Sequence, residues 1–160
     1  MLVAVLLAAV MVLLTFWLHY RCLLWFSRSV SSYRMTPQGR MLVIILLIFT
    51  IHLFEIALYA AAYRLAVETL GIGSLHLNPL AGFPLSGFME YLYYSAVVYT
   101  SLGLGDVYPT GHVRFLSAVE VLNGLLLIAW SGSFTFLAMG RLWPWQGCSP
   151  VNPQEVSDDD

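Results

Sequence analysis

Long apolar runs alternate with shorter polar connections along this chain of 160 residues. The run from residue 2 to residue 20 contains no charged side chain, and the runs 41–67 and 112–139 contain only a few ionisable groups. A helix needs about 20 apolar residues to cross the roughly 30 Å of hydrocarbon in a bilayer. The pattern therefore predicts three membrane-spanning helices.

The connection between the second and third runs differs in character from the first. Residues 68–87 are rich in glycine and proline, which predicts a loop. Residues 88–100 are apolar and aromatic, but they are too short to cross a bilayer and are more typical of a re-entrant helix. Residues 101–106 then contain Gly103 and Gly105, which predict irregular backbone at membrane depth. Such backbone is tolerated where protein buries it or where it lines a water-filled path.

The composition supports a membrane location for the whole chain. Hydrophobic residues make up 59% of the sequence and charged residues 10%, against about 25% charged residues in soluble domains. A cleaved signal peptide is the alternative for residues 2–20, but it would begin with basic residues. Here the start is uncharged, and Trp17, Tyr20 and Trp25 follow, as interfacial aromatic residues do. We therefore favour a retained helix.

The chain contains no lysine, and the positions of its arginines predict how it is oriented in the membrane. Four arginines lie in the first connection and one follows the third run: Arg21, Arg28, Arg34, Arg40 and Arg141. Because basic residues favour the cytoplasmic side, we expect a multi-pass protein of the inner (plasma) membrane with a cytoplasmic C-terminus. The N-terminus and residues 68–111 would then face outward.

The ionisable residues give no indication of catalysis. Cys22 and Cys148 match no metal or redox spacing, the four histidines are scattered, and no nucleophile–base pair is recognisable. No basic run indicates nucleic-acid binding. We therefore expect no enzyme, no cofactor, no small-molecule substrate and no nucleic-acid partner.

The segment around the two glycines indicates a site for cations. Alternating glycine with L-residues lets successive carbonyls point to the same side, because glycine adopts left-handed conformations without steric cost. A row of such carbonyls can replace the water shell of a cation. A short helix ending at Thr100 would also direct its negative dipole end toward the same place.

The sequence Thr100-Ser101-Leu102-Gly103-Leu104-Gly105-Asp106 resembles the potassium-channel signature Thr-Thr-Val-Gly-Tyr-Gly-Asp. The likeness is to the pore domain of bacterial potassium channels and covers residues 41–140. It implies an all-α membrane protein with outer helix, re-entrant pore helix, selectivity-filter loop and inner helix, in which a homotetramer surrounds one pore. Residues 1–40 would then add a transmembrane helix with an Arg-rich cytoplasmic loop, and residues 141–160 a disordered cytoplasmic tail.

The resemblance also implies roles for single residues. The filter would be formed by Thr100, Ser101, Leu102, Gly103, Leu104 and Gly105, with K⁺ bound at Ser101, Leu102, Gly103 and Leu104 as the permeant ligand. The residues expected to support the filter are Asp106, Tyr93, Tyr94 and Glu120, with Tyr94 as the expected donor to Asp106. Gly124 is a candidate gating hinge on the inner helix.

Leu104 departs from the family pattern in a way that bears on selectivity. The family tyrosine at this position braces the filter through its hydroxyl, which leucine lacks, although the backbone carbonyl remains. The sequence therefore predicts a potassium channel and leaves two alternatives open. These are a weakly selective monovalent cation channel of the same fold and a non-conducting membrane scaffold or accessory subunit.

Glu120, His52 and Glu55 are among the ionisable residues inside the apolar runs, where charges are costly and usually functional or paired. Glu120 either braces the pore helix or only forms a hydrogen bond to a neighbouring helix, without a role in conduction. His52 and Glu55 share one face of the second helix. They indicate either a proton sensor or, as we favour, a buried polar contact with the first helix or a neighbouring subunit.

Overall fold

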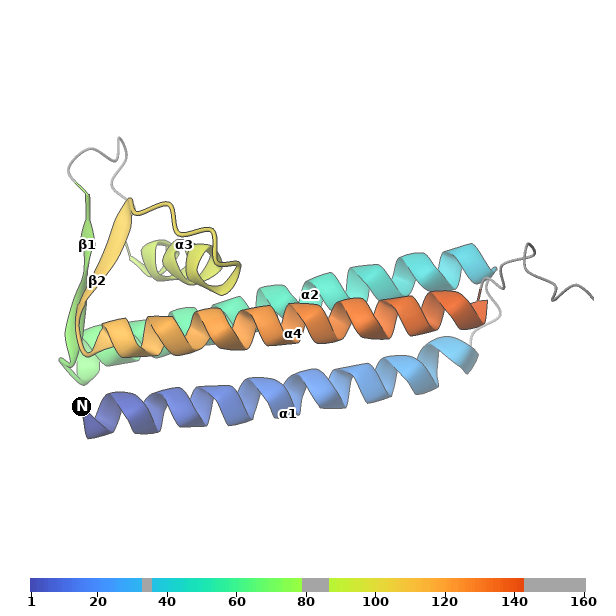
Figure 1. Cartoon of the computed structure of the whole chain (residues 1–160), viewed down its shortest axis with the longest axis horizontal. Helices are drawn as coiled ribbons and strands as arrows, with labels where there is room; N and C mark the ends of the chain where they lie inside the picture. Colours follow the sequence, from blue (N-terminus) through green and yellow to red (C-terminus); the bar gives the residue numbers. More distant parts are fainter. Residues whose placement is uncertain (33–35, 79–86, 143–160) are drawn as a thin grey trace, which may run out of the picture.

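Three long helices that alternate in direction form the body of the protein (Figure 1). The computed structural model describes residues 1–32, 36–78 and 87–142. The helices are α1 (Leu2–Ser32), α2 (Pro37–Arg64) and α4 (Val113–Leu142), and each is long and apolar enough to span a membrane. The prediction of three spans is confirmed.

The first connection is shorter than the sequence suggested. The helix continues through Arg21 and Arg28 to Ser32, so the expected Arg-rich loop is mostly helical. α2 then begins at once, because the Thr36 hydroxyl accepts a hydrogen bond from the backbone N–H of Gly39 at 3.2 Å and a proline occupies the first turn. Residues 33–35 and 143–160 lie outside the described residues, and with them Arg34 and nearly all of the predicted tail.

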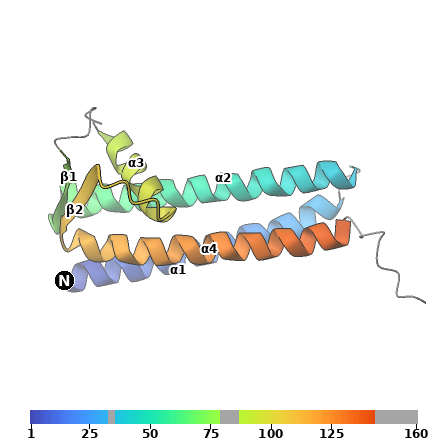
Figure 2. The same ribbon diagram turned by 45° about the horizontal axis from the view of Figure 1, so that its top comes forward.

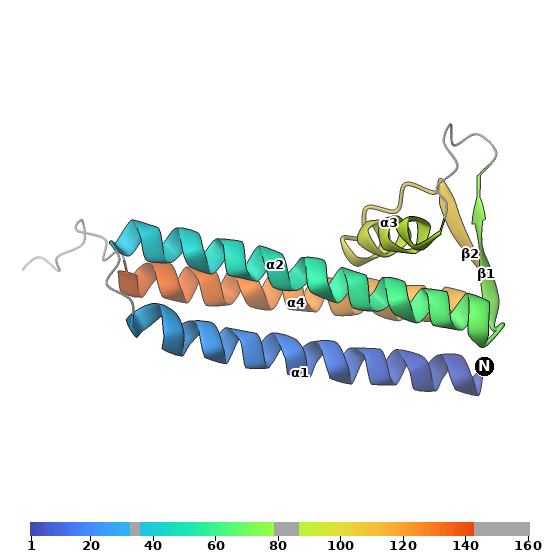
Figure 3. The ribbon, with the colours of Figure 1, turned by 180° about the vertical axis from the view of Figure 1, so that it is seen from behind.

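A short helix, α3 (Phe88–Tyr99), fills one end of the structure, as the sequence predicted for the re-entrant segment. It packs against α2 and α4, whereas α1 lies on the opposite side of that pair (Figures 1 and 3). Because α3 covers only part of the length of the long helices, the chain that follows it lies well inside the length of the bundle (Figure 2).

The loop predicted between α2 and α3 contains regular structure. α2 continues into a π-helical turn (Leu65–Thr69), and β1 (Gly73–Leu77) pairs antiparallel with β2 (Val107–Gly111). The pairing sets Gly73 opposite Gly111, where a Cβ on Gly111 would come within 2.9 Å of the Gly73 Cα. Two facing glycines thus let the strands approach closely. The mostly helical fold class is confirmed, with this two-stranded sheet as an addition.

The sheet lies at the same end of the structure as the N-terminus, and α4 ends at the opposite end (Figure 1). Which of these two ends faces the cytoplasm stays a prediction.

The interior has two apolar clusters separated along the bundle axis by polar side chains. The cluster nearer the sheet contains buried residues of every helix, among them Tyr59, Tyr63, Tyr99, Leu116 and Leu127. The other joins α1 and α2 through Leu23, Phe26, Ile44 and Ile48. The polar residues between them lie behind the end of α3, which is where the candidate site begins.

Candidate functional site

The backbone after α3 is tied to the end of that helix. The N–H of Ser101 donates to the Val98 carbonyl at 2.9 Å, and the N–H of Leu102 donates to the Val97 carbonyl, also at 2.9 Å. The Thr100 hydroxyl turns back to the Ala96 carbonyl at 2.7 Å. These bonds satisfy carbonyls that the last turn of a helix leaves open. They also fix where the filter segment, residues 100–105, starts.

Backbone handedness alternates along the filter segment. Ser101, Gly103 and Gly105 have φ angles of +56°, +57° and +76°, whereas Leu102 and Leu104 keep negative φ. Alternation of this kind turns successive peptide planes so that their carbonyls point to one side. The sequence predicted it from the glycines, but Ser101 was not foreseen in the left-handed region. That conformation costs an L-residue roughly 1–2 kcal/mol.

The apolar side chains of the filter segment are uncovered in the single chain. Leu102 is 62% exposed and Leu104 is 59% exposed, although each sits between residues of left-handed conformation. In the single chain these two side chains are therefore available for contact with another molecule.

Asp106 holds the far end of the filter segment. Its carboxylate accepts hydrogen bonds from the Tyr93 hydroxyl and from the Val107 N–H at 2.9 Å. The bond to Asp106 raises the pKa of Tyr93, so the phenol keeps its proton. The prediction that Tyr94 is the donor is wrong. Tyr94 points to α4 instead, where its hydroxyl lies 2.7 Å from the Ser117 Oγ.

Glu120 lies fully buried behind α3 and connects three helices. It accepts from the Tyr63 hydroxyl of α2, and its Oε1 lies 2.6 Å from the Ser95 Oγ of α3. Ser95 has one proton, yet its Oγ is also 2.8 Å from the Ile56 carbonyl. A protonated Glu120 satisfies both contacts, because it donates to Ser95 and Ser95 donates to Ile56. Glu120 therefore contacts the short helix through Ser95.

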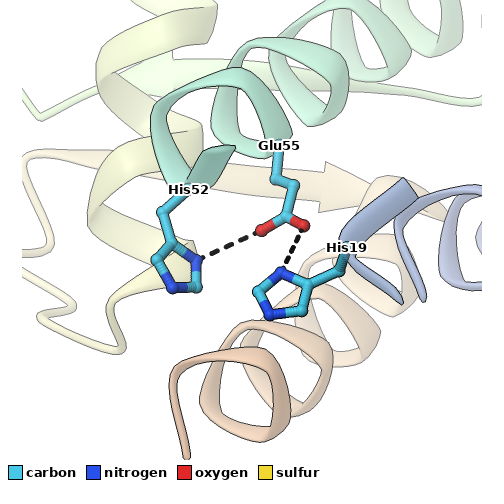
Figure 4. A group of neighbouring side chains, drawn as sticks. All are labelled: His19, His52 and Glu55. Atoms are coloured by element: carbon cyan, nitrogen blue, oxygen red, sulfur yellow. Dashed lines mark hydrogen bonds and ion pairs between the residues drawn. The ribbon is translucent and has the colours of Figure 1, made fainter. Parts of the chain in front are cut away.

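A second buried carboxylate lies among side chains of α1, α2, α3 and α4, which we call the Glu55 cluster. Figure 4 shows three of its members, His19, His52 and Glu55. Glu55 of α2 lies between two imidazoles, 2.9 Å from His19 Nδ1 of α1 and 3.2 Å from His52 Nδ1. The Tyr99 hydroxyl of α3 donates to it at 2.6 Å. Ser131 of α4 completes the cluster, 3.1 Å and 3.0 Å from the Nε2 atoms of His19 and His52. The favoured prediction of a buried contact with the first helix is confirmed.

His19, His52 and Glu55 also have the donor types and the proximity of a metal site. One ligand atom from each of His19, His52 and Glu55 lies within 4.8 Å of the others, and two histidines with a glutamate are a donor set that zinc accepts. Every one of these atoms, however, is already within hydrogen-bonding distance of another member of the cluster. Hydrogen bonding accounts for the arrangement, and we assign no metal.

At Gly124 the backbone of α4 lies directly against the last residue of α3. A Cβ at this position would overlap the Tyr99 carbonyl oxygen and lie 3.1 Å from its ring. Close packing therefore requires glycine here. The role as a gating hinge stays a prediction.

Two side chains attach α1 to the other helices, and the sequence did not identify either of them as a contact residue. His19 reaches Glu55 and Ser131, and the Thr15 hydroxyl accepts from the Asn123 amide at 2.8 Å. The only sequence signal for either was a polar residue inside an apolar run, without an indication of its partner.

The comparisons with known proteins identify the class of this chain. Residues 62–139 match the family model described as "Ion channel". The match runs from the end of α2 through α3, the filter segment and the sheet into α4, and it leaves α1 outside. No curated protein and no solved structure matches the chain. Residues 62–139 are therefore similar to an ion-channel domain, which indicates a channel rather than an enzyme, and the chain carries an additional apolar helix ahead of that segment.

Proposed function

We propose that the protein is a potassium-conducting channel whose filter is the backbone of residues 100–105. The alternating handedness of Ser101, Gly103 and Gly105 is the observation that carries this proposal. A backbone that presents its carbonyls to one side supplies the oxygen ligands that replace the hydration shell of K⁺. Ions would bind at the carbonyls of Ser101, Leu102, Gly103 and Leu104, with the hydroxyls of Thr100 and Ser101 at the inner end.

The electrostatic setting favours cations over anions. The filter segment has no charged side chain, and it follows the C-terminal end of α3, where the helix dipole is negative. Asp106 adds a carboxylate at its other end. No cationic side chain stands between α3 and Asp106 in the sequence.

One chain supplies one row of carbonyls, so the proposal requires several copies around an axis. Four copies give the ring that the potassium-channel resemblance implies. The exposed side chains of Leu102 and Leu104 support assembly, because a neighbouring copy would cover them. In this assembly α4 lines the inner cavity. The arginines near the far end of the bundle favour a cytoplasmic C-terminus and an outward N-terminus in the plasma membrane.

Reconstitution of the purified protein in liposomes tests the proposal. With K⁺ on one side and Na⁺ on the other, a potassium channel gives a reversal potential close to the potassium limit. A potential near zero would instead identify a weakly selective cation channel of the same fold. Absence of cation flux from a monomeric or dimeric protein would favour the scaffold alternative.

A further inference from the structure

The helix α1 lies outside the segment that matches the channel family, yet it contributes a fully buried histidine to the Glu55 cluster. Building on the proposed function, we propose that the Glu55 cluster positions the inner end of the filter and that it does so by holding one bound proton. His19 of α1 is then a positioning residue for ion selectivity.

The cluster acts on the filter through Tyr99. Tyr99 is the last residue of α3 and directly precedes Thr100. It is fully buried, its hydroxyl is bonded to Glu55, and its carbonyl packs against α4 at Gly124. Because the residue is held at both its side chain and its backbone, a shift of Glu55 moves the start of the filter segment. His19 in turn fixes the other oxygen of Glu55.

The hydrogen bonds of the cluster are complete only with one added proton. If His52 is neutral with its proton on Nε2, its Nδ1 has no donor, because the Tyr99 hydroxyl, 2.9 Å away, gives its one proton to Glu55. If both imidazoles are neutral and donate from Nδ1 to Glu55, both Nε2 atoms are bare. Ser131 lies between these two atoms and has one proton to donate. An additional proton on His19 or His52 gives both of these contacts a donor, because the protonated ring donates to Ser131 and Ser131 donates to the other ring. The Tyr99 hydroxyl and the His52 Nδ1–H then share the remaining oxygen of Glu55.

Charge balance favours the same state. The side chains of His19 and Glu55 are fully buried and that of His52 is 15% exposed, so a net charge in the cluster would be poorly solvated. One imidazolium and one carboxylate sum to zero. Loss of the proton leaves one negative charge, and a second added proton leaves one positive charge. A divalent metal ion on the same three residues would also leave a net positive charge.

Other ionisable groups facing the cluster do not change this balance. Cys22 of α1, Tyr59 of α2 and Glu120 of α4 interact electrostatically with Glu55 or Tyr99. None of the three can carry a positive charge, so the charge that compensates Glu55 comes from the two histidines. The potassium preference should therefore be highest at intermediate pH and fall at lower and at higher pH.

The decisive comparison uses three variants on α1, each as full-length protein in liposomes. His19→Leu removes the donor to Glu55, whereas His19→Asn retains an N–H donor near the position of Nδ1. Thr15→Val is the matched control, because Thr15 is also fully buried and bonded across helices, to Asn123, but does not touch the cluster. Assembly is checked by size-exclusion chromatography, and the potassium-to-sodium permeability ratio is measured between about pH 5 and pH 9.

The expected result is a fall of the ratio by at least about fivefold in His19→Leu, the lower end for coupled sites. His19→Asn should recover most of the ratio, and Thr15→Val should keep both the ratio and its pH profile. A wild-type ratio in His19→Leu at every pH overturns the inference, and so does an equal fall in Thr15→Val. If His19→Leu does not assemble, Tyr99→Phe removes only the hydroxyl and must lower the ratio in the same way.

A second readout does not depend on conduction. In protein labelled with ¹⁵N-histidine, solid-state NMR should show one imidazolium at neutral pH that disappears in Glu55→Gln, because a neutral amide no longer needs the compensating proton. Two neutral rings in the wild type, or a stoichiometric metal in elemental analysis, overturn the bound proton. A wild-type protein without potassium preference overturns the proposed function itself, whereas a selective wild type with an unaffected His19→Leu overturns only the role of α1.

Discussion

Replacing Gly103 by alanine perturbs the backbone of the filter and nothing else in the chain. Its φ is +57°, and a Cβ placed there meets no atom within 4 Å, so the cost is conformational rather than steric. A left-handed L-residue costs roughly 1–2 kcal/mol. This free energy lowers the population of the left-handed conformation by about 5- to 30-fold in each chain. If all four chains must adopt it at once, potassium flux falls by more than about 500-fold.

Gly71 supplies a matched control for this prediction. Its φ is +58°, a Cβ there also meets nothing within 4 Å, and it lies between the π-helical turn and β1, away from the filter. Gly71→Ala therefore has the same local cost but should leave flux unchanged. Potassium flux into liposomes is compared at equal amounts of assembled protein. D-alanine at position 103, introduced by peptide ligation, should restore conduction. Equal flux in the two L-alanine variants would refute the role of backbone handedness.

Three further substitutions test the support of the filter. Leu104→Tyr supplies a hydroxyl at the position where the family has tyrosine and should raise the potassium-to-sodium permeability ratio; an unchanged ratio would contradict that bracing account. Tyr93→Phe removes only the donor to Asp106 and should shorten openings in single-channel records, whereas openings of wild-type length would show that the bond does not hold the filter. Gly124→Ala places a methyl group against the Tyr99 carbonyl, where overpacking costs about 1–3 kcal/mol, and should lower the melting temperature of the assembled protein. A melting temperature equal to that of the wild type would mean that α3 and α4 separate easily.

The three spans could be predicted from sequence because hydropathy alone determines which segments enter a bilayer. Their ends could not. α1 continues as far as Ser32, well beyond the apolar run, because a helix can extend into the interface, where arginine and aromatic side chains are tolerated. The strands β1 and β2 were missed because their pairing joins residues 30 to 38 positions apart, and each is only five residues long.

The irregular backbone of residues 101–106 could be predicted because its glycines are a local signal, whereas the side chains that contact it depend on helix phase and on distant partners. Tyr93 and Tyr94 differ by one position, about 100° around a helix, and the sequence does not show which of them faces Asp106. The partner of Glu55 on α1 lies 36 positions away, and nothing in the local pattern selects His19 among the polar residues of that run.

The structure also changes the effect that is expected from leucine at position 104. Loss of the tyrosine hydroxyl at this position would leave the middle of the filter without a polar brace, but both ends of the segment have one. Tyr93 donates to Asp106 at one end and Tyr99 donates to Glu55 at the other. Each pair joins a phenol of α3 to a carboxylate on a different part of the chain, so α3 and the filter segment form one supported unit. The inner pair reaches α1 through His19, which gives the additional helix a physical connection to the residues proposed as the filter.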